Sequence, residues 1–149
     1  AGNLFKRNES SFKALELGLK EAISKYYDLY KNEDCEFIKS FPKQIEFSSS
    51  WFVKMQSGGH LTSHIHEDGW ISGAIYLSIP KKTKTQDEGA IELSTHGDDY
   101  PIINDDFPKK VIKPKEGDVI FFPSSVFHRT IPFESDEERI CIAFDLKPS

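Results

Sequence analysis

The 149-residue sequence has only two cysteines, Cys35 and Cys141, and Cys141 lies in an apolar alternating segment. A disulfide-stabilised secreted domain is therefore not expected, and two free thiols in a reducing, cytoplasmic compartment are the simpler interpretation. No apolar stretch approaches the roughly 18 residues of a membrane span, and no secretory signal pattern opens the chain, so no membrane partner is expected. Because Met55 is the only methionine, we expect a chain processed or cut from a longer polypeptide, with room for an upstream domain.

Clustered positive charge is also absent from the sequence. The formal net charge is -5 at pH 7, and the lysines are scattered along the chain. Proteins that bind nucleic acids need grouped Lys and Arg side chains against the phosphates, so no nucleic-acid partner is expected. A small molecule or a peptide is the expected partner, and the sequence holds no indication of an oligomeric state.

The length and composition are those of one globular domain spanning residues 1–149. A chain of this size buries roughly two-thirds of the surface that its unfolded form exposes. Hydrophobic residues make up 38% and charged residues 29% of the sequence, which is ordinary for a globular protein. The aromatic content of 13%, with twelve Phe, indicates a well-filled apolar interior.

Helical periodicity appears only in the N-terminal part. Between Ser10 and Lys31 apolar residues recur at steps of three and four, no proline interrupts them, and Ser10 or Ser11 can serve as the N-cap. This pattern predicts an amphipathic helix over about residues 10–31.

From residue 45 onward the pattern is typical of short strands separated by turns. The first, 45–55, shows a broken alternation that predicts one common face for its apolar residues Ile45, Phe47, Trp51, Val53 and Met55. Further strands are expected over 64–66, 71–79, 90–93, 111–112, 118–122, 126–131 and 139–146. A helix followed by about eight strands predicts a mainly β fold, a helix-supported sandwich or squashed barrel. The long segment 96–108 is expected to be a loop that covers substrate.

The spacing of three histidines predicts a metal-centred reaction site. His64 and His66 are two positions apart, so a single strand would direct both imidazoles to one face. His128, from a distant strand, would supply a third ligand and leave further coordination positions open, as a catalytic metal requires. His60 and His96 have no partner at a useful spacing and are interpreted as ordinary surface or core histidines.

Several segments resemble the family of 2-oxoglutarate and Fe(II)-dependent oxygenases. The segment 64–77 (HIHEDGWISGAIYL) is similar to the N-terminal metal strand of this family, in a subgroup sometimes found behind tetratricopeptide repeats. The C-terminal half of the family resembles 117–123 (GDVIFFP), 127–132 (FHRTIP) and 134–144 (ESDEERICIAF). The resemblance covers residues 45–146 and implies a double-stranded β-helix, a jelly-roll or cupin-like fold, with Fe(II) and 2-oxoglutarate as cofactor and cosubstrate.

The resemblance also implies roles for individual residues. His64, His66 and His128 would bind the metal, and Arg139, eleven positions after His128, would bind the far carboxylate of 2-oxoglutarate. Tyr76 matches a tyrosine that hydrogen-bonds the same carboxylate in prolyl-hydroxylase-like relatives. The plainer interpretations are that Arg139 neutralises the acidic turn 134–138 and that Tyr76 is a core aromatic.

The metal motif departs from the usual family pattern at one position. Most family members have a carboxylate where His66 stands, whereas a second register would use His66-Glu67-Asp68 as the ordinary His-x-Asp. We favour three histidines because the subgroup often has His-x-His there, and Asp68 is kept as the alternative. Imidazole and carboxylate both suit Fe(II), but a neutral triad leaves the site one charge more positive.

The function that follows is hydroxylation of a small molecule or a peptide side chain by an Fe(II)- and 2-oxoglutarate-dependent dioxygenase. No acid–base dyad or serine nucleophile is evident, so no catalytic residue is predicted beyond the metal ligands. One alternative is a cupin-type metal enzyme that does not use 2-oxoglutarate and does not need Arg139. The other is a non-enzymatic binding module with a structural metal closed by a fourth ligand such as Asp68.

Overall fold

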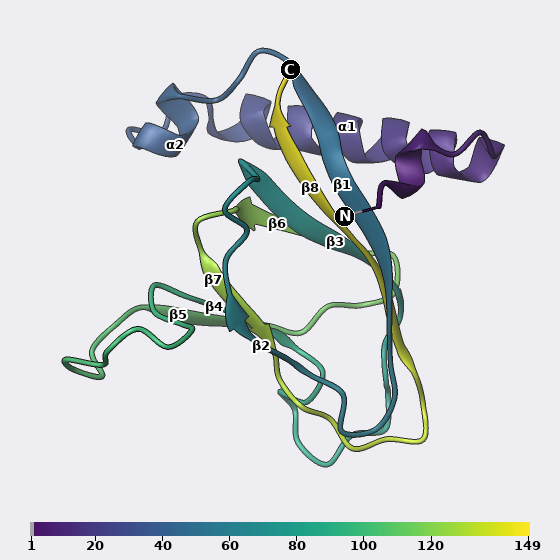
Figure 1. Ribbon diagram of the computed structural model, residues 1–149, viewed down its shortest axis with the longest axis vertical. Helices are drawn as coiled ribbons and strands as arrows, with labels where there is room; N and C mark the ends of the chain where they lie inside the picture. The colour runs from purple at the N-terminus through teal and green to yellow at the C-terminus, as the bar shows by residue number, and fades with distance from the viewer. Residues whose placement is uncertain (1) are drawn as a thin grey trace.

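Two four-stranded antiparallel sheets face each other in the computed structural model, which describes residues 2–149 (Figure 1). The major sheet has the order β1 (Ile45–Met55), β8 (Arg139–Pro148), β3 (Ile71–Ser78) and β6 (Val119–Pro123). The minor sheet has the order β2 (Leu61–His64), β7 (Phe127–Thr130), β4 (Ile91–Ser94) and β5 (Lys109–Ile112). This crossing order is that of a double-stranded β-helix, so the predicted fold class is confirmed.

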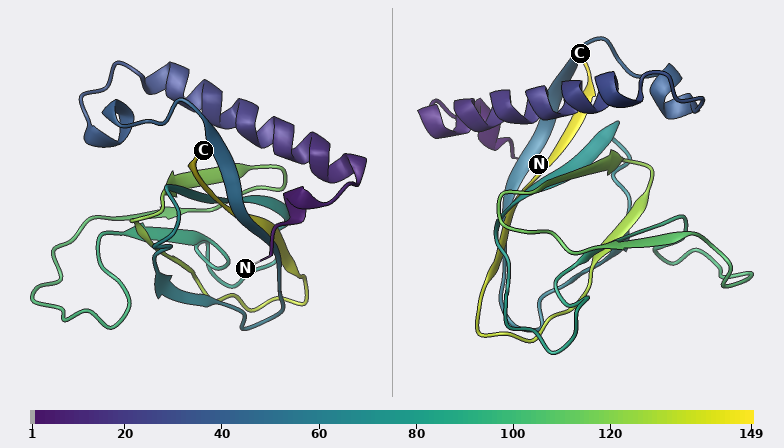
Figure 2. Two further views of the ribbon diagram at one scale, coloured as in Figure 1. Left: turned by 45° about the horizontal axis from the view of Figure 1, so that its top comes forward. Right: turned by 180° about the vertical axis from the view of Figure 1, so that it is seen from behind.

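Helix α1 (Ser10–Tyr30) covers the outer face of the major sheet (Figure 2). Its two buried residues, Leu19 and Ile23, enter a core formed with side chains of the sheet. The other buried members of this core are Phe5, Phe47, Ile71, Ile142, Phe144 and Leu146. The helix lies where the periodicity of the sequence predicted it, because one apolar stripe repeating every 3.6 residues fits a flat apolar sheet face.

Strand β8 supplies both faces of the major sheet by simple alternation. Ile142, Phe144 and Leu146 point toward α1 and belong to its core. The residues between them point the other way, into the space between the two sheets, and Arg139, Cys141 and Ala143 line a cavity there. The strand is buried on both sides, which explains its nearly continuous apolar sequence.

A β-bulge in β1 changes which face its side chains occupy. The pairing with β8 shifts between Phe47, opposite Leu146, and Ser49, opposite Asp145, so that Ser48 is an extra residue. Phe47 therefore lies in the helix-side core, whereas Trp51 and Val53 line the cavity. The prediction of one common face for the apolar residues of β1 was wrong, because the inserted residue reverses the alternation.

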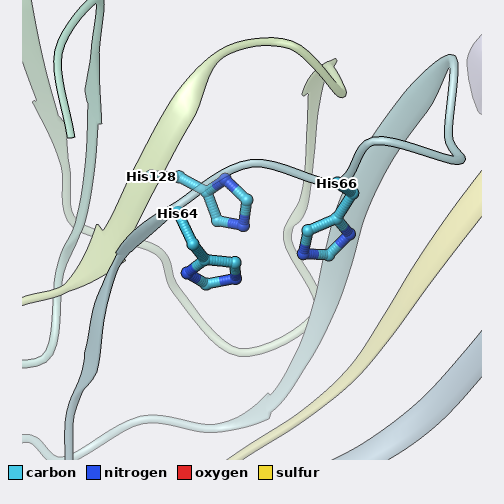
Figure 3. A group of neighbouring side chains, drawn as sticks. All are labelled: His64, His66 and His128. Atoms are coloured by element: carbon cyan, nitrogen blue, oxygen red, sulfur yellow. The ribbon is translucent and has the colours of Figure 1, made fainter. Parts of the chain in front are cut away.

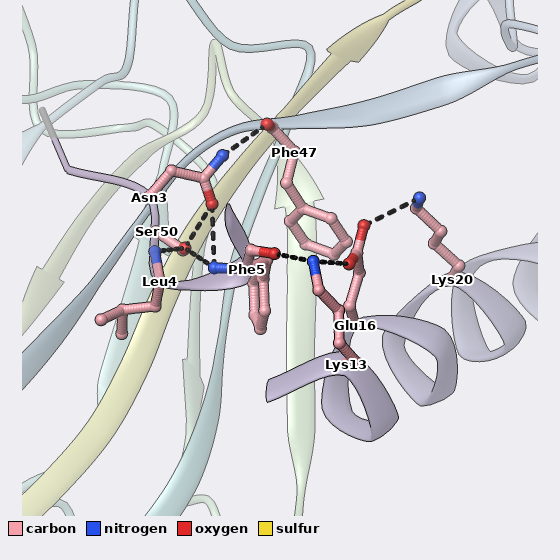
Figure 4. A network of polar contacts seen from close by, with 8 residues as sticks. All are labelled: Asn3, Leu4, Phe5, Lys13, Glu16, Lys20, Phe47 and Ser50. Atoms are coloured by element: carbon pink, nitrogen blue, oxygen red, sulfur yellow. Dashed lines mark hydrogen bonds and ion pairs between the residues drawn. The ribbon is translucent and has the colours of Figure 1, made fainter. Parts of the chain in front are cut away.

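The N-terminal residues contact the β1 edge of the major sheet at Ser50, which the sequence analysis did not predict. Asn3 forms an isolated parallel bridge with Ser50 of β1, and its side-chain amide donates to the carbonyl of Phe47 at 2.8 Å (Figure 4). Ser50 Oγ donates to Asn3 Oδ1 at 2.9 Å and accepts from the backbone of Leu4 at 2.7 Å. The short 3₁₀ helix η1 (Leu4–Lys6) then places Phe5 under α1. The bridge occupies part of the edge of β1, which reduces the length of strand open to pairing with another chain.

A second short helix, α2 (Glu36–Lys39), was also not predicted. It packs aromatic side chains against the start of β3: Phe37 stacks on Trp70 with ring centroids 4.5 Å apart, and Phe41 meets the same ring edge-on at 5.0 Å. Within residues 2–149, no helix has both the length and the apolar character needed to cross a bilayer. Cys35 is exposed and Cys141 is buried, and both are free thiols, as expected.

Candidate metal centre

Three histidines converge at one end of the space between the sheets. His64 is the last residue of β2 and lies opposite His128 of β7 in the ladder, with ring centroids 4.3 Å apart. His66 completes the group, 5.2 Å from His64 and 4.9 Å from His128 between ring centroids. One nitrogen of each ring lies within 4.8 Å of the others. Figure 3 shows the three rings turned toward a common space.

The route by which His66 reaches this group differs from the prediction. Strand β2 ends at His64, and His66 lies in the following turn, not two positions along the same strand. Its backbone is fixed instead by a 3.1 Å hydrogen bond from His66 N to the carbonyl of Ser124. The two histidines therefore face one space because the turn directs His66 back toward β7.

Each of the three rings has an oxygen acceptor near Nδ1. His64 Nδ1 is 2.7 Å from the carbonyl oxygen of Thr62, and His128 Nδ1 is 3.2 Å from that of Val126. His66 Nδ1 is 2.5 Å from Asp145 Oδ1. A carbonyl or carboxylate acceptor at Nδ1 favours the tautomer with the proton on Nδ1. All three Nε2 lone pairs are then available for a metal ion.

Asp145, on β8, was missed by the sequence analysis. Its carboxylate also accepts from Ser72 Oγ at 2.7 Å and from Ser49 Oγ at 2.9 Å, and the residue is only 9% exposed. Burial alone would raise the pKa of Asp145, but the hydrogen bonds from His66 and Ser72 outweigh it and hold this pKa below its ordinary value. The carboxylate is therefore ionised at neutral pH. An acid in the middle of an apolar strand was the signal that could have identified it.

Burial is the largest influence on the pKa of His128. Desolvation lowers the pKa of His128 to about 4, and the neighbouring rings of His64 and His66 lower it further while the Val126 carbonyl opposes the change. A neutral imidazole is the form that binds metals. The site therefore presents His128 ready for coordination across the whole physiological pH range.

Arg139, at the start of β8, is a buried cation without an acidic partner. It is 3% exposed, its Nε donates to the carbonyl of Gly89 at 2.9 Å, and its Nη1 lies 3.9 Å from Cys141 Sγ. None of the ion pairs formed among residues 2–149 involves Arg139, so it does not neutralise the acidic turn that follows residue 133. A buried guanidinium of this kind favours a planar carboxylate from a ligand.

Tyr76, on β3, lies directly beside Arg139. The guanidinium carbon is 5.1 Å from the centroid of the Tyr76 ring, and the tyrosine is 1% exposed. Burial raises the pKa of Tyr76 to about 12, against an opposing effect of the Arg139 charge. Tyr76 is thus a neutral phenol that can donate a hydrogen bond.

A single cavity between the two sheets joins these residues. The cavity has a volume of about 60 Å³ and is lined by the three histidines at one end and by Tyr76, Arg139 and Cys141. Most of the remaining lining is apolar, with Trp51, Val53, Leu61, Ile91 and Phe122 among its residues. An apolar lining with a few convergent polar groups is typical of small-molecule sites.

The other residues considered from the sequence lie elsewhere. Asp68 is exposed and is not among the side chains grouped around His64. His60 and His96 contact the backbone carbonyls of Gly58 and Tyr100, and neither belongs to the group. The cluster that the structure brings together therefore contains three histidines, with Asp145 behind one of them.

Comparison with known proteins agrees with this geometry. Residues 49–145 match the family model described as "Putative 2OG-Fe(II) oxygenase". No curated protein matches the sequence. The match covers well over half of the chain, including both ends of the histidine cluster, Tyr76 and Arg139.

Solved structures of low sequence identity share the fold. A prolyl-4-hydroxylase from Pseudomonas putida superposes with a TM-score of 0.61 at 13% identity, covering 95% of this chain and 68% of that protein. A Burkholderia pseudomallei oxidoreductase of the 2OG-Fe(II) oxygenase family gives 0.55 at 15% identity, covering 74% and 48%. HygX from Streptomyces hygroscopicus, crystallised with nickel and 2-oxoglutarate, gives 0.54 at 14% identity, covering 75% and 60%.

The chain thus spans about half the length of the Burkholderia oxidoreductase that it resembles. What it shares with these proteins is the double-stranded β-helix fold, which in this chain is built from eight strands in two sheets. Together with the family match over residues 49–145, this shows that the chain belongs to the 2OG-Fe(II) oxygenase family.

Proposed function

We propose that this protein is an Fe(II)- and 2-oxoglutarate-dependent dioxygenase that hydroxylates a C–H bond of a small molecule or of a peptide side chain. The observation that carries the proposal is Arg139, a buried cation in the histidine-lined cavity with no acidic partner among residues 2–149. A dicarboxylate cosubstrate would supply the missing charge.

The side chains proposed to hold the metal are His64, His66 and His128. Their donor set fits Fe(II), for which imidazole is a suitable ligand, and three protein ligands leave room for a chelating cosubstrate and dioxygen. The Nδ1 contacts of all three rings favour binding through Nε2. Asp68 is exposed and would have to move to replace one of them.

Arg139 and Tyr76 are proposed to bind the carboxylate of 2-oxoglutarate that lies far from the metal. The guanidinium can make paired hydrogen bonds to a carboxylate, and the neutral phenol of Tyr76 can donate one more. Burial of both side chains strengthens these contacts, because the cavity excludes most competing water.

When bound, Fe(II) and 2-oxoglutarate supply the oxidising chemistry: dioxygen converts the 2-oxo acid to succinate and carbon dioxide, and the second oxygen atom enters the substrate as a hydroxyl group. The chain itself orients the cosubstrate through Arg139 and keeps water out of the reaction space. The apolar side chains of Trp51, Val53 and Leu61 in the lining favour an aliphatic portion of the substrate beside the histidines.

The free cysteines and the net charge bear on the cellular compartment and on the class of substrate. The free thiols of Cys35 and Cys141 support a reducing compartment such as the cytoplasm as the site of action. The net charge of -5 argues against nucleic acid as the substrate.

Anaerobic titration of the Fe(II)-loaded protein with 2-oxoglutarate tests the proposal, with the visible charge-transfer band of the chelate as the signal. We expect the band in the wild type and a need for at least roughly 30-fold more 2-oxoglutarate in Arg139→Ala, since removing one partner of a buried charge pair costs about 2 kcal/mol or more. Lys54→Ala is the matched control, because Lys54 is an exposed cation of the neighbouring strand β1, paired with Glu138.

Three other results would contradict the proposal or part of it. If the iron-loaded wild type gives no band at any 2-oxoglutarate concentration, the dioxygenase proposal fails. Metal-dependent turnover that is independent of 2-oxoglutarate and of Arg139 would then identify a cupin-type enzyme. Equal titration curves for Arg139→Ala and Lys54→Ala would exclude Arg139 as the carboxylate ligand.

A further inference from the structure

Asp145 is a buried acid that contacts the three-histidine cluster without being part of it. The carboxylate lies on the cavity face of β8, and its Oδ1 contacts His66 Nδ1 at 2.5 Å. It does not belong to the group of side chains that could share one metal ion. The Asp145 carboxylate therefore lies outside the group and contacts the Nδ1 side of the His66 ring.

A buried chain of hydroxyl groups holds this carboxylate in place. Ser72 Oγ donates to Asp145 Oδ1 at 2.7 Å and is itself 2.8 Å from Ser124 Oγ, while Ser49 Oγ donates to Oδ2 at 2.9 Å. The carbonyl of Ser124 accepts from the backbone of His66 at 3.1 Å. His66 is therefore fixed at its main chain and at its ring by the same small network.

The other two rings are held differently. His64 and His128 direct Nδ1 to the carbonyl of the residue two positions earlier, which is Thr62 within β2 for His64 and Val126 just before β7 for His128. His66 lies in a turn, where no such carbonyl contact is made, and its Nδ1 contacts the side chain of Asp145 instead. The ring that lies outside the strands thus has a carboxylate partner, whereas the other two rings have backbone carbonyls.

We propose that Asp145 is a positioning residue of the metal site, which orients His66 with Nε2 toward the metal and places a negative charge behind a ligand set that has none of its own. Carboxylates that hydrogen-bond metal-binding histidines fix the tautomer and the ring orientation, and they strengthen the ligand. The inference rests on the proposed metal-binding role of His66.

The test is the affinity of the full chain, freed of metal, for Co(II), measured by the visible ligand-field bands of the bound ion. Asp145→Asn keeps the size of the side chain and an acceptor oxygen but removes the charge. We expect the Co(II) dissociation constant to rise roughly 10- to 100-fold, with altered ligand-field bands. The matched control is Glu16→Gln, which removes a carboxylate that accepts a hydrogen bond from Lys20 in helix α1, away from the cavity lining.

A double-mutant cycle separates positioning from general stabilisation. In a His66→Ala background, Asp145→Asn should have almost no further effect on Co(II) affinity, because the ring through which it acts is gone. Thermal unfolding of each metal-free variant identifies any that has lost its fold, and Ser49→Ala provides a milder variant that removes only the Oδ2 contact.

Each outcome decides the inference. An unchanged Co(II) affinity in a folded Asp145→Asn protein overturns it, as does an equal loss with and without His66, which would indicate a structural role alone. If the wild type itself binds no Co(II), the metal centre of the proposed function fails first. If Co(II) binds as expected but 2-oxoglutarate does not, the positioning role survives and the dioxygenase proposal does not.

Discussion

The guanidinium of Arg139 lies over the ring of Tyr76, with 5.1 Å between its central carbon and the ring centroid. The two residues come from adjacent strands, β8 and β3, and both are almost fully buried. This contact holds the planar cation in one orientation before any ligand arrives, and such preorganisation reduces the entropy that binding costs.

Replacement of Tyr76 should therefore weaken 2-oxoglutarate binding less than replacement of Arg139 does. In Tyr76→Phe the ring still supports the guanidinium, and only one hydroxyl donor is lost, worth about 1 kcal/mol, so affinity should fall roughly fivefold. Tyr76→Ala should also lose the support and fall further. Equilibrium titration with 2-oxoglutarate measures both, and a Tyr76→Phe protein weaker than Arg139→Ala would contradict this ranking.

The two cysteines should react at very different rates. Cys35 is exposed, whereas Cys141 is buried in the cavity wall and burial raises the pKa of its thiol. A thiol reagent at neutral pH should modify Cys35 rapidly and Cys141 only slowly, because the thiolate is the reactive form. Mass spectrometry of peptides after timed alkylation gives both rates. Saturating 2-oxoglutarate with metal should slow Cys141 and leave Cys35 unchanged; equal protection of both would argue against a ligand in this cavity.

Gly73 should tolerate no side chain. A Cβ at this position in β3 would lie 2.5 Å from the carbonyl oxygen of Ile120 and 2.8 Å from the ring of Phe144. Gly73→Ala should destabilise the protein by about 2–3 kcal/mol, because backbone and a core ring would have to move. Gly18→Ala is the control, since nothing lies within 4 Å of its Cβ in helix α1. It should raise stability by about 0.5–1 kcal/mol. Chemical denaturation measures both changes.

Acid should destabilise the metal-free protein partly through His128. Its pKa is lowered by burial from an ordinary 6.5 to about 4, so between these values the unfolded chain binds a proton here that the folded chain does not. Stability contributed by this group is present above pH 6.5 and is lost as the pH falls toward 4. Between pH 7 and 4 the wild type should lose about 2–3 kcal/mol more than His128→Gln does. Denaturant midpoints over this range test the difference.

Most elements were predictable because their signals are local. Helix α1 begins and ends within one residue of the predicted range, and all eight strands overlap expected segments. The side-chain faces of β1 were not predictable, because Ser48 looks like any strand residue and becomes an insertion only through the pairing of β1 with β8. The N-terminal bridge of Asn3 to Ser50 depends on a contact between distant parts of the chain in the same way.

The residues of the candidate site likewise divide into those that sequence spacing predicts and those that depend on contacts between distant segments. His64, His128, Tyr76 and Arg139 follow from family spacing, and the structure places all four around one cavity. The position of His66 required knowledge of the turn after β2, which local periodicity does not contain. The role of Asp145 depends on a partner 79 residues away in the sequence and could not be read from either segment alone.

The inserted Ser48 divides strand β1 into two parts whose inward side chains pack against different regions of the protein. On its N-terminal side, Phe47 serves the packing of α1, and on its C-terminal side Ser49 and Trp51 serve the reaction space and the Asp145 network. Variation at Phe47 therefore acts on the stability of the fold, whereas variation at Ser49 and Trp51 acts on the Asp145 network and the cavity. A single strand can in this way acquire a new substrate preference without weakening the scaffold that carries it.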